Sequence, residues 1–500
     1  MKSLLIVLFI YSLCLSITAE TIVDSNINAS ITWSLQDSPF IISGTIQVSG
    51  TSHPVVTVEP GVQVRFNSGA SLVLGSSSNS SHRGGLIVNG TTESPVLFTA
   101  NTYTPTAGFW NCIRVNTYAK QDNVVLNNAI LEYGGSGGYG LFDVAAANPT
   151  LNSCSFRYSA NFGIYHSASN VNASIIDCVF SNNSGYPIYT NVSGAHLITG
   201  DNTFVNNGYQ RILLRSVNLD IGCTWQNYGI PYEQEGDLVL YNGADPLVLS
   251  PGITLLFRQG KAALVGSSTN SSVLGSLMAE ETTFTSVDNQ LLWRGIDFRS
   301  YCQTSTLESC EISFVDNIAP GAVTIRGNNL ISINNCEFHD IDNYAISANS
   351  GKPFAVTNCN IHHCARTISA YFQDMHKLGL GNVYQTNGDN RIHCLAGTLP
   401  VSAIWTRQYT PILMLGSSGI SGNSPYPELQ MPYGTVLEFA SETSLSIGSP
   451  ISSSYKGSLR ATGVTFKGQE ATSGYWTGLI FNVYGLPSLI SGCIIRDAGF

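Results

Sequence analysis

Short runs in which apolar residues alternate with polar ones fill most of the chain, and Gly, Asn and Ser separate the runs. Segments such as Val58–Phe66 and Leu249–Phe257 are rich in β-branched and aromatic residues. This pattern is typical of short strands joined by turns. The exposed faces of soluble helices are normally built from Glu, Lys and Arg, and these residues are scarce here. The pattern therefore predicts an all-β protein.

A cysteine recurs at one place in this pattern, flanked by apolar residues. Cys154 and Cys178 are 24 residues apart, and the sequence spacings from Cys310 to Cys336 and from Cys336 to Cys359 are 26 and 23 residues. A small apolar side chain that returns at such a period indicates a ladder of buried, mostly unpaired cysteines on stacked coils. We expect about 24 residues per coil.

These spacings predict a right-handed parallel β-helix solenoid. Alternate residues such as Leu151, Cys154 and Phe156 should point inward, while each short strand pairs with the strands of the coils above and below it. Right-handedness follows from the crossover preference of parallel strands. A leucine-rich repeat lacks support because no Leu-x-x-Leu-x-Leu period occurs, and propeller blades repeat at about 40–50 residues. Turns should carry Asn, which tolerates left-handed backbone and can form amide ladders; the candidates are Asn152, Asn334, Asn335 and Asn358.

A longer period is superimposed on the coils. Three tryptophans, Trp110, Trp293 and Trp476, return every 183 residues, and three others open the repeats, namely Trp33, Trp225 and Trp405. Segments equivalent to Val58–Phe66 follow at Leu249–Phe257 and Met431–Phe439. We predict repeats over residues 20–221 and 222–402 and an incomplete third repeat over 403–500. Because the third stops in mid-repeat at Phe500, we expect either a fragment of a longer protein or an open coil that associates end to end with another chain.

The first residues resemble a secretory signal peptide. Lys2 precedes an apolar run from Leu4 to Leu15, and small residues lead to a cleavage point after Ala19. Residues 1–19 are therefore predicted to be removed, and the protein is predicted to be secreted and extracellular. In that compartment, Asn-x-Ser/Thr sequons become candidate glycan sites: Asn28, Asn79, Asn89, Asn172, Asn182, Asn191 and Asn270.

Composition and charge exclude several classes of protein and partner. Hydrophobic residues make up 43% of the chain, which excludes disorder, and 11% are charged, with a net charge of −10. The negative charge argues against nucleic acid as a partner, and no apolar stretch of about 18 residues follows the signal, so no membrane span is expected. Eleven cysteines remain after cleavage, and an odd number cannot all pair with one another. Three lie outside the ladder and are the better candidates for bridges: Cys302, Cys364 and Cys394.

The pattern resembles the right-handed parallel β-helix superfamily of pectate lyases, polygalacturonases, alginate-modifying epimerases and phage tailspikes. The long repeat is similar to extracellular β-helix repeats like those of the bark beetle junction protein ectodomain and of secreted microbial surface proteins. Four segments carry this resemblance: Thr32–Trp33, Glu59–Val62, Gly90–Thr99 and Trp293–Ile296. The resemblance implies the fold, whereas enzymes and inert scaffolds both occur in this superfamily.

Catalytic motifs of the superfamily are missing. Neither the Arg-x-Pro-x-x-Arg of pectate lyases nor the Asn-Thr-Asp, Asp-Asp, Gly-His-Gly and Arg-Ile-Lys set of polygalacturonases is present. The best acidic group for acid–base chemistry is Glu337, His339, Asp340 and Asp342, where alternation places Glu337 and His339 on one strand face. A solvated turn is the alternative interpretation. A lyase would also imply calcium; otherwise no cofactor is expected.

Two further groups invite a functional interpretation. His362, His363 and Cys364 follow Cys359 at a spacing compatible with zinc, although Cys359 belongs to the predicted ladder and should face the core. The tryptophans could form a platform for carbohydrate, but their strict return at one position favours packing in the core or groove.

Two classes of function remain. The repeats, the sequons and the missing motifs favour a non-catalytic extracellular scaffold that binds glycans or cell-surface or matrix proteins. The alternative is a polysaccharide lyase or glycoside hydrolase with an unfamiliar catalytic pattern. An enzyme should break the repeat with acidic and basic residues concentrated at one groove, and the sequence shows no such break.

Overall fold

The computed structural model describes residues 20–145, 147–168 and 172–499, so the predicted signal segment 1–19 lies outside the described residues. The protein is a nearly all-β parallel solenoid with about 18 turns of about 25 residues each, and 4% of it is helical. These values confirm the predicted fold class and coil length. Two compact bodies are present: an N-terminal body of residues up to Pro187 with Gly200–Tyr209, and a C-terminal body of Ile188–Thr199 with the chain from Gln210 onward.

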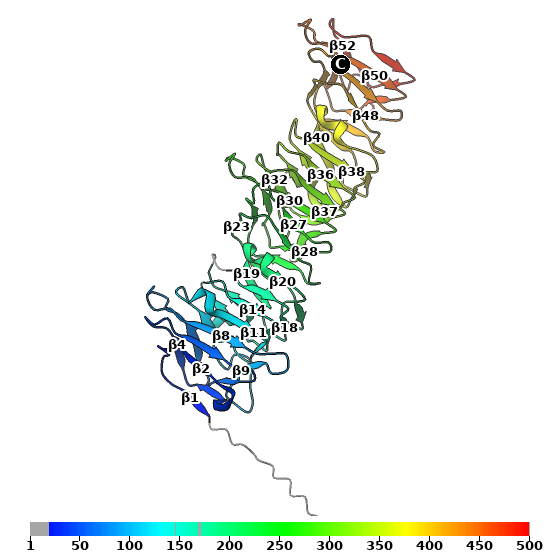
Figure 1. The fold of residues 1–500 in the computed structure, drawn as a ribbon. Coiled ribbons are helices and arrows are strands. Elements are labelled where there is room, and N and C mark those ends of the chain that lie inside the picture. Colours follow the sequence, from blue (N-terminus) through cyan, green and yellow to red (C-terminus); the bar gives the residue numbers. More distant parts are fainter. Residues whose placement is uncertain (1–19, 146, 169–171, 500) are drawn as a thin grey trace, which may run out of the picture. The chain divides into compact units, whose positions relative to one another are not determined.

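Parallel ladders of strands build the N-terminal body, drawn in blue to cyan-green in Figure 1. The first ladder is β1 (Thr21–Val23), β3 (Phe40–Ile42), β6 (Gln63–Phe66), β9 (Val96–Ala100), β12 (Ala129–Glu132), β15 (Ser155–Arg157), β18 (Val179–Ser181) and β21 (Thr203–Val205). The second is β2 (Ile31–Trp33), β5 (Val55–Val58), β8 (Gly85–Asn89), β11 (Val124–Asn127), β14 (Thr150–Asn152) and β17 (Ser174–Ile176). The third is β4 (Thr45–Val48), β7 (Ser71–Leu74), β10 (Ile113–Val115), β13 (Gly140–Val144) and β16 (Phe162–His166).

The C-terminal body repeats this arrangement. It begins with β19 (Ile188–Asn191) and β20 (Ile198–Thr199). One ladder is β22 (Ile212–Arg215), β25 (Tyr232–Gln234), β28 (Thr254–Phe257), β31 (Thr283–Ser286), β34 (Glu311–Val315), β37 (Glu337–Ala348), β39 (Asn360–His362) and β41 (Val383–Gln385). Another is β24 (Cys223–Trp225), β27 (Leu247–Leu249), β30 (Leu277–Glu280), β33 (Ser305–Glu308), β36 (Ile331–Asn334) and β38 (Phe354–Thr357).

A further ladder of this body is β23 (Asn218–Leu219), β26 (Leu238–Leu240), β29 (Ala263–Val265), β32 (Ile296–Phe298) and β35 (Gly321–Ile325), which continues through β37 to β40 (Cys364–Tyr371), β42 (Ile392–Leu395), β45 (Ile412–Met414), β48 (Val436–Phe439), β51 (Thr465–Gly468) and β54 (Ile494–Ile495). The last coils add two ladders. One is β43 (Thr398–Leu399), β46 (Ser418–Ile420), β49 (Ser444–Ile447) and β52 (Gly478–Phe481), and the other is β44 (Ala403–Ile404), β47 (Glu428–Met431), β50 (Ser458–Thr462) and β53 (Leu489–Ser491).

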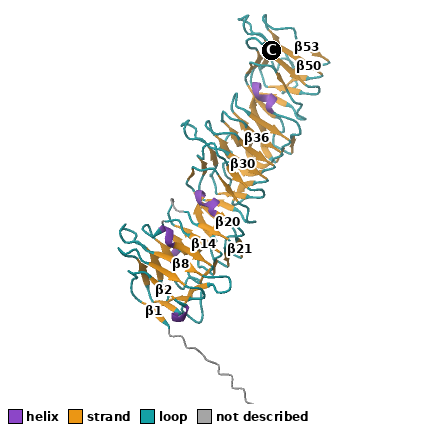
Figure 2. Ribbon diagram, viewed as in Figure 1, coloured by secondary structure: helices purple, strands orange, loops and turns teal. Residues whose placement is uncertain are grey.

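Figure 2 shows how little helix interrupts the strands. The helices are short 3-10 segments: η1 (Leu35–Asp37), η2 (Gln121–Asn123), η3 (Ser136–Gly138), η4 (Val192–Leu197) and η5 (Phe372–Lys377).

Inward-facing residues stack in columns along each body. In the N-terminal body Phe156 is in register with Phe180, which is in register with Phe204, and the centroids of successive rings are 5.2 Å apart. Because parallel strands lie about 4.8 Å apart, in-register residues of successive coils touch. Residues that are one short period apart in the sequence are therefore in contact in the structure.

The tryptophans of the long repeat belong to this core. Trp110, Trp293 and Trp476 each stack on a phenylalanine at 4.0–4.3 Å, and each indole N–H donates a hydrogen bond of 2.7–2.8 Å to a backbone carbonyl. All six tryptophans are at most 3% exposed. The three tryptophans that return every 183 residues thus occupy equivalent core positions. Burial of all six excludes the carbohydrate platform and confirms that they pack in the core.

The cysteine ladder is also buried. Cys154 and Cys178 are adjacent, with a Cys154 N–H to Cys178 Sγ distance of 3.4 Å. The thiols of Cys310 and Cys359 flank that of Cys336, and together with burial they raise its pKa. All eleven cysteines in the described part of the chain are free. The expectation of bridges at Cys302, Cys364 and Cys394 is not met, since these three are free and buried.

Left-handed residues form the corners of the coils. Asn335 and Asn358 each have φ of 54°, as expected for Asn at these turns. Asn152 and Asn334 instead end strands β14 and β36, one position before the left-handed residue. One amide-to-amide bond joins successive turns, since Asn358 Nδ2 donates to Asn334 Oδ1 over 3.0 Å, whereas Asn335 Nδ2 donates to Ser309 Oγ over 2.9 Å.

Candidate functional site

Sequence reasoning singled out two groups, and the structure joins them into one stripe on successive coils of the C-terminal body. We name it the histidine–carboxylate stripe, and it comprises Glu311, Glu337, His339, Asp340, His362 and His363. Strand β34 supplies Glu311, β37 supplies Glu337 and His339, and β39 supplies His362. Glu311 is in register with Glu337, which is in register with Asn360. Strand alternation then turns these side chains outward, away from the core.

The histidines bind carboxylates diagonally, from one coil to the next. His339 Nε2 lies 3.1 Å from Glu311 Oε1, and His362 Nε2 lies 2.8 Å from Glu337 Oε1. The imidazoles of His339 and His362 stack with centroids 5.4 Å apart and planes 6° apart. In-register carboxylates on neighbouring strands repel each other, and the diagonal histidines offset that repulsion.

Two carboxylates flank His339. Its second nitrogen, Nδ1, lies 2.8 Å from Asp340 Oδ2, so both ring nitrogens face carboxylates. Burial by itself lowers the pKa of His339, but the bonds to Asp340 and Glu311 outweigh it and raise the pKa above the usual value. When protonated, His339 donates one hydrogen bond to Glu311 of the preceding coil and one to its neighbour Asp340, and so links the two coils.

A left-handed corner within β37 separates the two aspartates of the candidate cluster. Asp340 occupies left-handed backbone with φ of 53°, and Asp342 is exposed on the following segment. Among the described residues no hydrogen bond or ion pair reaches the side chain of Asp342. The structure thus brings Glu337, His339 and Asp340 into the stripe and leaves Asp342 outside it.

The three candidate zinc ligands, His362, His363 and Cys364, do not gather around one point. The buried thiol of Cys364 lies 3.6 Å from the carbonyl oxygen of Phe338 and 3.3 Å from that of His362. His362 Nδ1 instead lies 2.8 Å from His363 Nδ1 on the outer side of the coil. Within the part of the chain that the structure describes, no group of three or more His, Cys, Asp or Glu side chains has a metal-holding arrangement.

A shallow hollow of about 320 Å³ adjoins the stripe. Glu281, Glu311 and Glu337 line it together with Thr and Asn side chains. Sequence reasoning missed Glu311, although the signal was there: Glu311 follows Cys310 as Glu337 follows Cys336, one coil later. The two pairs occupy equivalent positions of successive coils, which places both carboxylates in one column.

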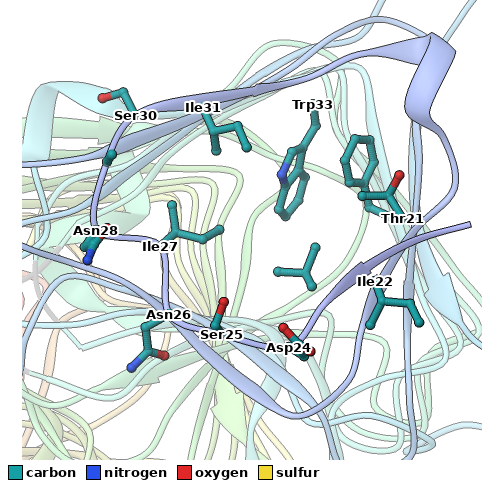
Figure 3. A pocket seen from close by; sticks show the side chains of 13 residues that line it. Thr21, Ile22, Asp24, Ser25, Asn26, Ile27, Asn28, Ser30, Ile31 and Trp33 are labelled. Carbon is teal, nitrogen blue, oxygen red and sulfur yellow. The ribbon is translucent and has the colours of Figure 1, made fainter.

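Another hollow, of about 370 Å³, lies in the first described turn of the N-terminal body. In Figure 3 Trp33, Ile27 and Ile31 point into it, whereas Asn28 and Ser30 lie at its rim. Trp33 also stacks on Phe40 at 5.0 Å. This hollow is an opening onto core side chains, and its lining has a single carboxylate, that of Asp24.

The candidate glycan sites differ in accessibility. Asn191 is fully buried and Asn172 is half-buried, whereas the other five are exposed: Asn28, Asn79, Asn89, Asn182 and Asn270. Asn79 and Asn270 occupy matching turns, where each side-chain oxygen accepts a hydrogen bond of 3.0 Å from the N–H two residues later.

Comparison of the chain with protein-family models and with curated proteins gives no match. No helix among the described residues is long and apolar enough to cross a membrane.

Proposed function

We propose that the protein is a secreted, non-catalytic extracellular scaffold that binds glycans or the surfaces of cell or matrix proteins. The observation that carries this proposal is the arrangement of the histidine–carboxylate stripe. Each stacked histidine binds a carboxylate of the preceding coil, at 3.1 Å for His339 and 2.8 Å for His362. Bonds of this kind hold neighbouring coils together. A glycosidase instead directs two carboxyl groups at a bond that lies between them.

The extracellular location rests on the leader and the sequons. A charged residue followed by an apolar run and a small residue at position 19 is typical of a cleaved signal. Five of the seven sequon asparagines are exposed on the solenoid surface. Expression in a secreting eukaryotic cell should release the protein into the medium with Glu20 as its first residue, which N-terminal sequencing would detect.

We also infer kinship with the pectate-lyase-like superfamily, and within it with the extracellular repeats of bark beetle type. The support is the set of segments Thr32–Trp33, Glu59–Val62, Gly90–Thr99 and Trp293–Ile296, together with the parallel solenoid. Kinship with that superfamily leaves the lyase or hydrolase alternative for experiment to decide, since the same fold serves scaffolds and enzymes.

The test pairs a binding assay with a degradation assay. The purified secreted protein is applied to a glycan array, and it is incubated with pectins, alginates, glucans and glycosaminoglycans, with and without calcium. We expect binding without release of reducing ends or unsaturated products. Turnover that disappears in the Asp340→Asn, Asp342→Asn double variant, but persists in an Asp220→Asn control on another coil, would replace the scaffold with an enzyme whose site lies at these two aspartates, beside the stripe.

A further inference from the structure

A polar groove on the N-terminal body has features that the scaffold interpretation does not use. Its volume is about 670 Å³, within the usual range of about 300–1,000 Å³ for small-ligand sites. It lies over the outer face of strands β6, β9 and β12 and beside the loop that follows β9. Its lining combines two tyrosines, Tyr103 and Tyr133, with three charged side chains and with hydroxyl and amide groups; the charged residues are Glu20, Arg65 and Glu132.

The ion pairs make the groove electrically balanced. Arg157 Nε lies 2.7 Å from Glu132 Oε2, and Thr99 Oγ1 donates to Glu132 Oε1 over 2.8 Å, so this nearly buried carboxylate is held from both sides. At the other end Arg65 lies 3.8 Å from Glu20 and donates to Gln63 over 3.0 Å. Each of the two acids that line the groove is therefore paired with an arginine, although Arg157 itself lies outside the lining. Charge complementarity accordingly favours a neutral ligand over an acidic or basic one.

The tyrosines supply an aromatic wall. Tyr133 stacks on Tyr158 of the next coil, with ring centroids 5.1 Å apart and planes 6° apart. Tyr158 thus covers one face of Tyr133, and the rest of that ring lines the groove. Tyr103 also lines the groove and is fully exposed. Among the described residues no group hydrogen-bonds to the hydroxyls of these three tyrosines, and burial beside Glu132 raises the pKa of Tyr133, which keeps its hydroxyl a donor.

The backbone at the two stacked tyrosines is strained. Tyr133 and Tyr158 have φ of 63° and 57°, in the left-handed region where a bulky L-residue is an outlier. On the next two coils the same corner is occupied by Asn182 and Asn206, with φ of 56° and 54°. Asn accepts this conformation far more easily than Tyr. Strain that the fold does not need is characteristic of functional positions.

We propose that this groove binds a neutral oligosaccharide, with one pyranose ring stacked on Tyr133 and its hydroxyl groups bonded to the ion-paired and amide side chains. A pyranose presents C–H bonds on its face and hydroxyls around its rim, which matches an aromatic wall surrounded by hydrogen-bonding groups. Tyr103, on the loop after β9, supplies a second exposed ring in the lining. This inference rests on the proposed function, because it names the ligand class and the surface that such a scaffold would use.

The experiment uses the full secreted chain and titrates it with neutral oligosaccharides from glucan and mannan digests, with oligogalacturonate as the acidic comparison. The Tyr133→Asn, Tyr158→Asn double variant removes both rings and places at the corner the residue that the next two coils already have. We expect it to bind the neutral sugar at least about tenfold more weakly, a change of about 1.4 kcal/mol, while its melting temperature stays unchanged or rises. Tyr433→Ala removes an exposed tyrosine from the C-terminal body and should bind like the wild type.

The outcomes separate this inference from the proposed function. If the wild type binds neutral oligosaccharides and the double variant binds equally well, the groove is not the site, while the glycan-binding scaffold stands. If oligogalacturonate binds more tightly than the neutral sugars, the assignment of a neutral ligand is wrong. If no glycan of any class binds, both the groove and the glycan-binding part of the proposed function fail.

Discussion

Replacing Trp293 with phenylalanine tests the repeated tryptophan stack by removing one hydrogen bond from it. Phenylalanine keeps a ring against Phe257, now 4.3 Å from the indole, but loses the N–H that donates to the carbonyl oxygen of Ser313 over 2.7 Å. Leaving that buried carbonyl without a partner costs about 1–3 kcal/mol. The smaller ring adds a cavity cost on the order of 1 kcal/mol. The free energy of unfolding should therefore fall by about 2–4 kcal/mol.

Trp405 provides the matched control within the same body. It is 3% exposed and packs edge-on against Phe372, but its indole N–H has no acceptor among the described residues. Trp405→Phe brings the same cavity cost, while it also removes a buried donor that lacks a partner. Since that donor carries a desolvation penalty of about 1–3 kcal/mol, we expect a net change near zero.

Urea unfolding followed by far-ultraviolet circular dichroism measures both variants without relying on tryptophan fluorescence. Each variant changes one buried side chain, so the slope with denaturant should match that of the wild type and the midpoints can be compared directly. Trp293→Phe should unfold at clearly lower urea than Trp405→Phe. Equal midpoints, or a larger loss for Trp405→Phe, would refute the assignment of the hydrogen bond as the stabilising feature of the stack.

Three further predictions concern thiols, glycans and pH. In the native protein a thiol reagent should react slowly with the part-exposed Cys223 and Cys493 and hardly at all with the buried cysteines. In denatured but unreduced protein the reagent should detect eleven free thiols, and complete protection there would show disulfides instead. Glycopeptide mass spectrometry should find glycans at the exposed sequon asparagines and none at the buried Asn191, and an occupied Asn191 would contradict its packing. Because the folded-state pKa of His339 is raised, its bond to Glu311 should stabilise the fold fully below about pH 6.5. That contribution of about 0.5–1 kcal/mol should be lost as pH rises through the raised pKa. Melting curves from pH 5 to 9 should show this decline in the wild type and a flatter profile in His339→Gln.

The coil period and the core could be predicted from the sequence because contacts in a solenoid run between neighbouring coils. Cys154 and Cys178 show this directly: the same apolar surroundings at a spacing of 24 residues put them in contact. The tryptophans at 183-residue intervals likewise identified three equivalent core positions. An inward-facing position carries an apolar signal, and that signal repeats with the coil.

Outward-facing positions carry no such signal, and the tertiary structure alone decided which of them meet. Coils differ in length, so Glu311 pairs in register with Glu337, 26 residues on, and yet bonds to His339, 28 residues on. Sequence reasoning found His339 and His362 in separate groups and did not identify Glu311 or the Tyr133–Tyr158 stack.

The sequence by itself thus determined the all-β solenoid, its coil length and its buried ladders, because burial imposes a periodic apolar pattern that can be read along the chain. The tertiary structure decided the pairing of surface charges, the strained tyrosine corner and the accessibility of each sequon. Those features depend on strand register and on loop conformation. Polar residues suit an exposed face in any register, so their order in the sequence does not indicate which of them become neighbours.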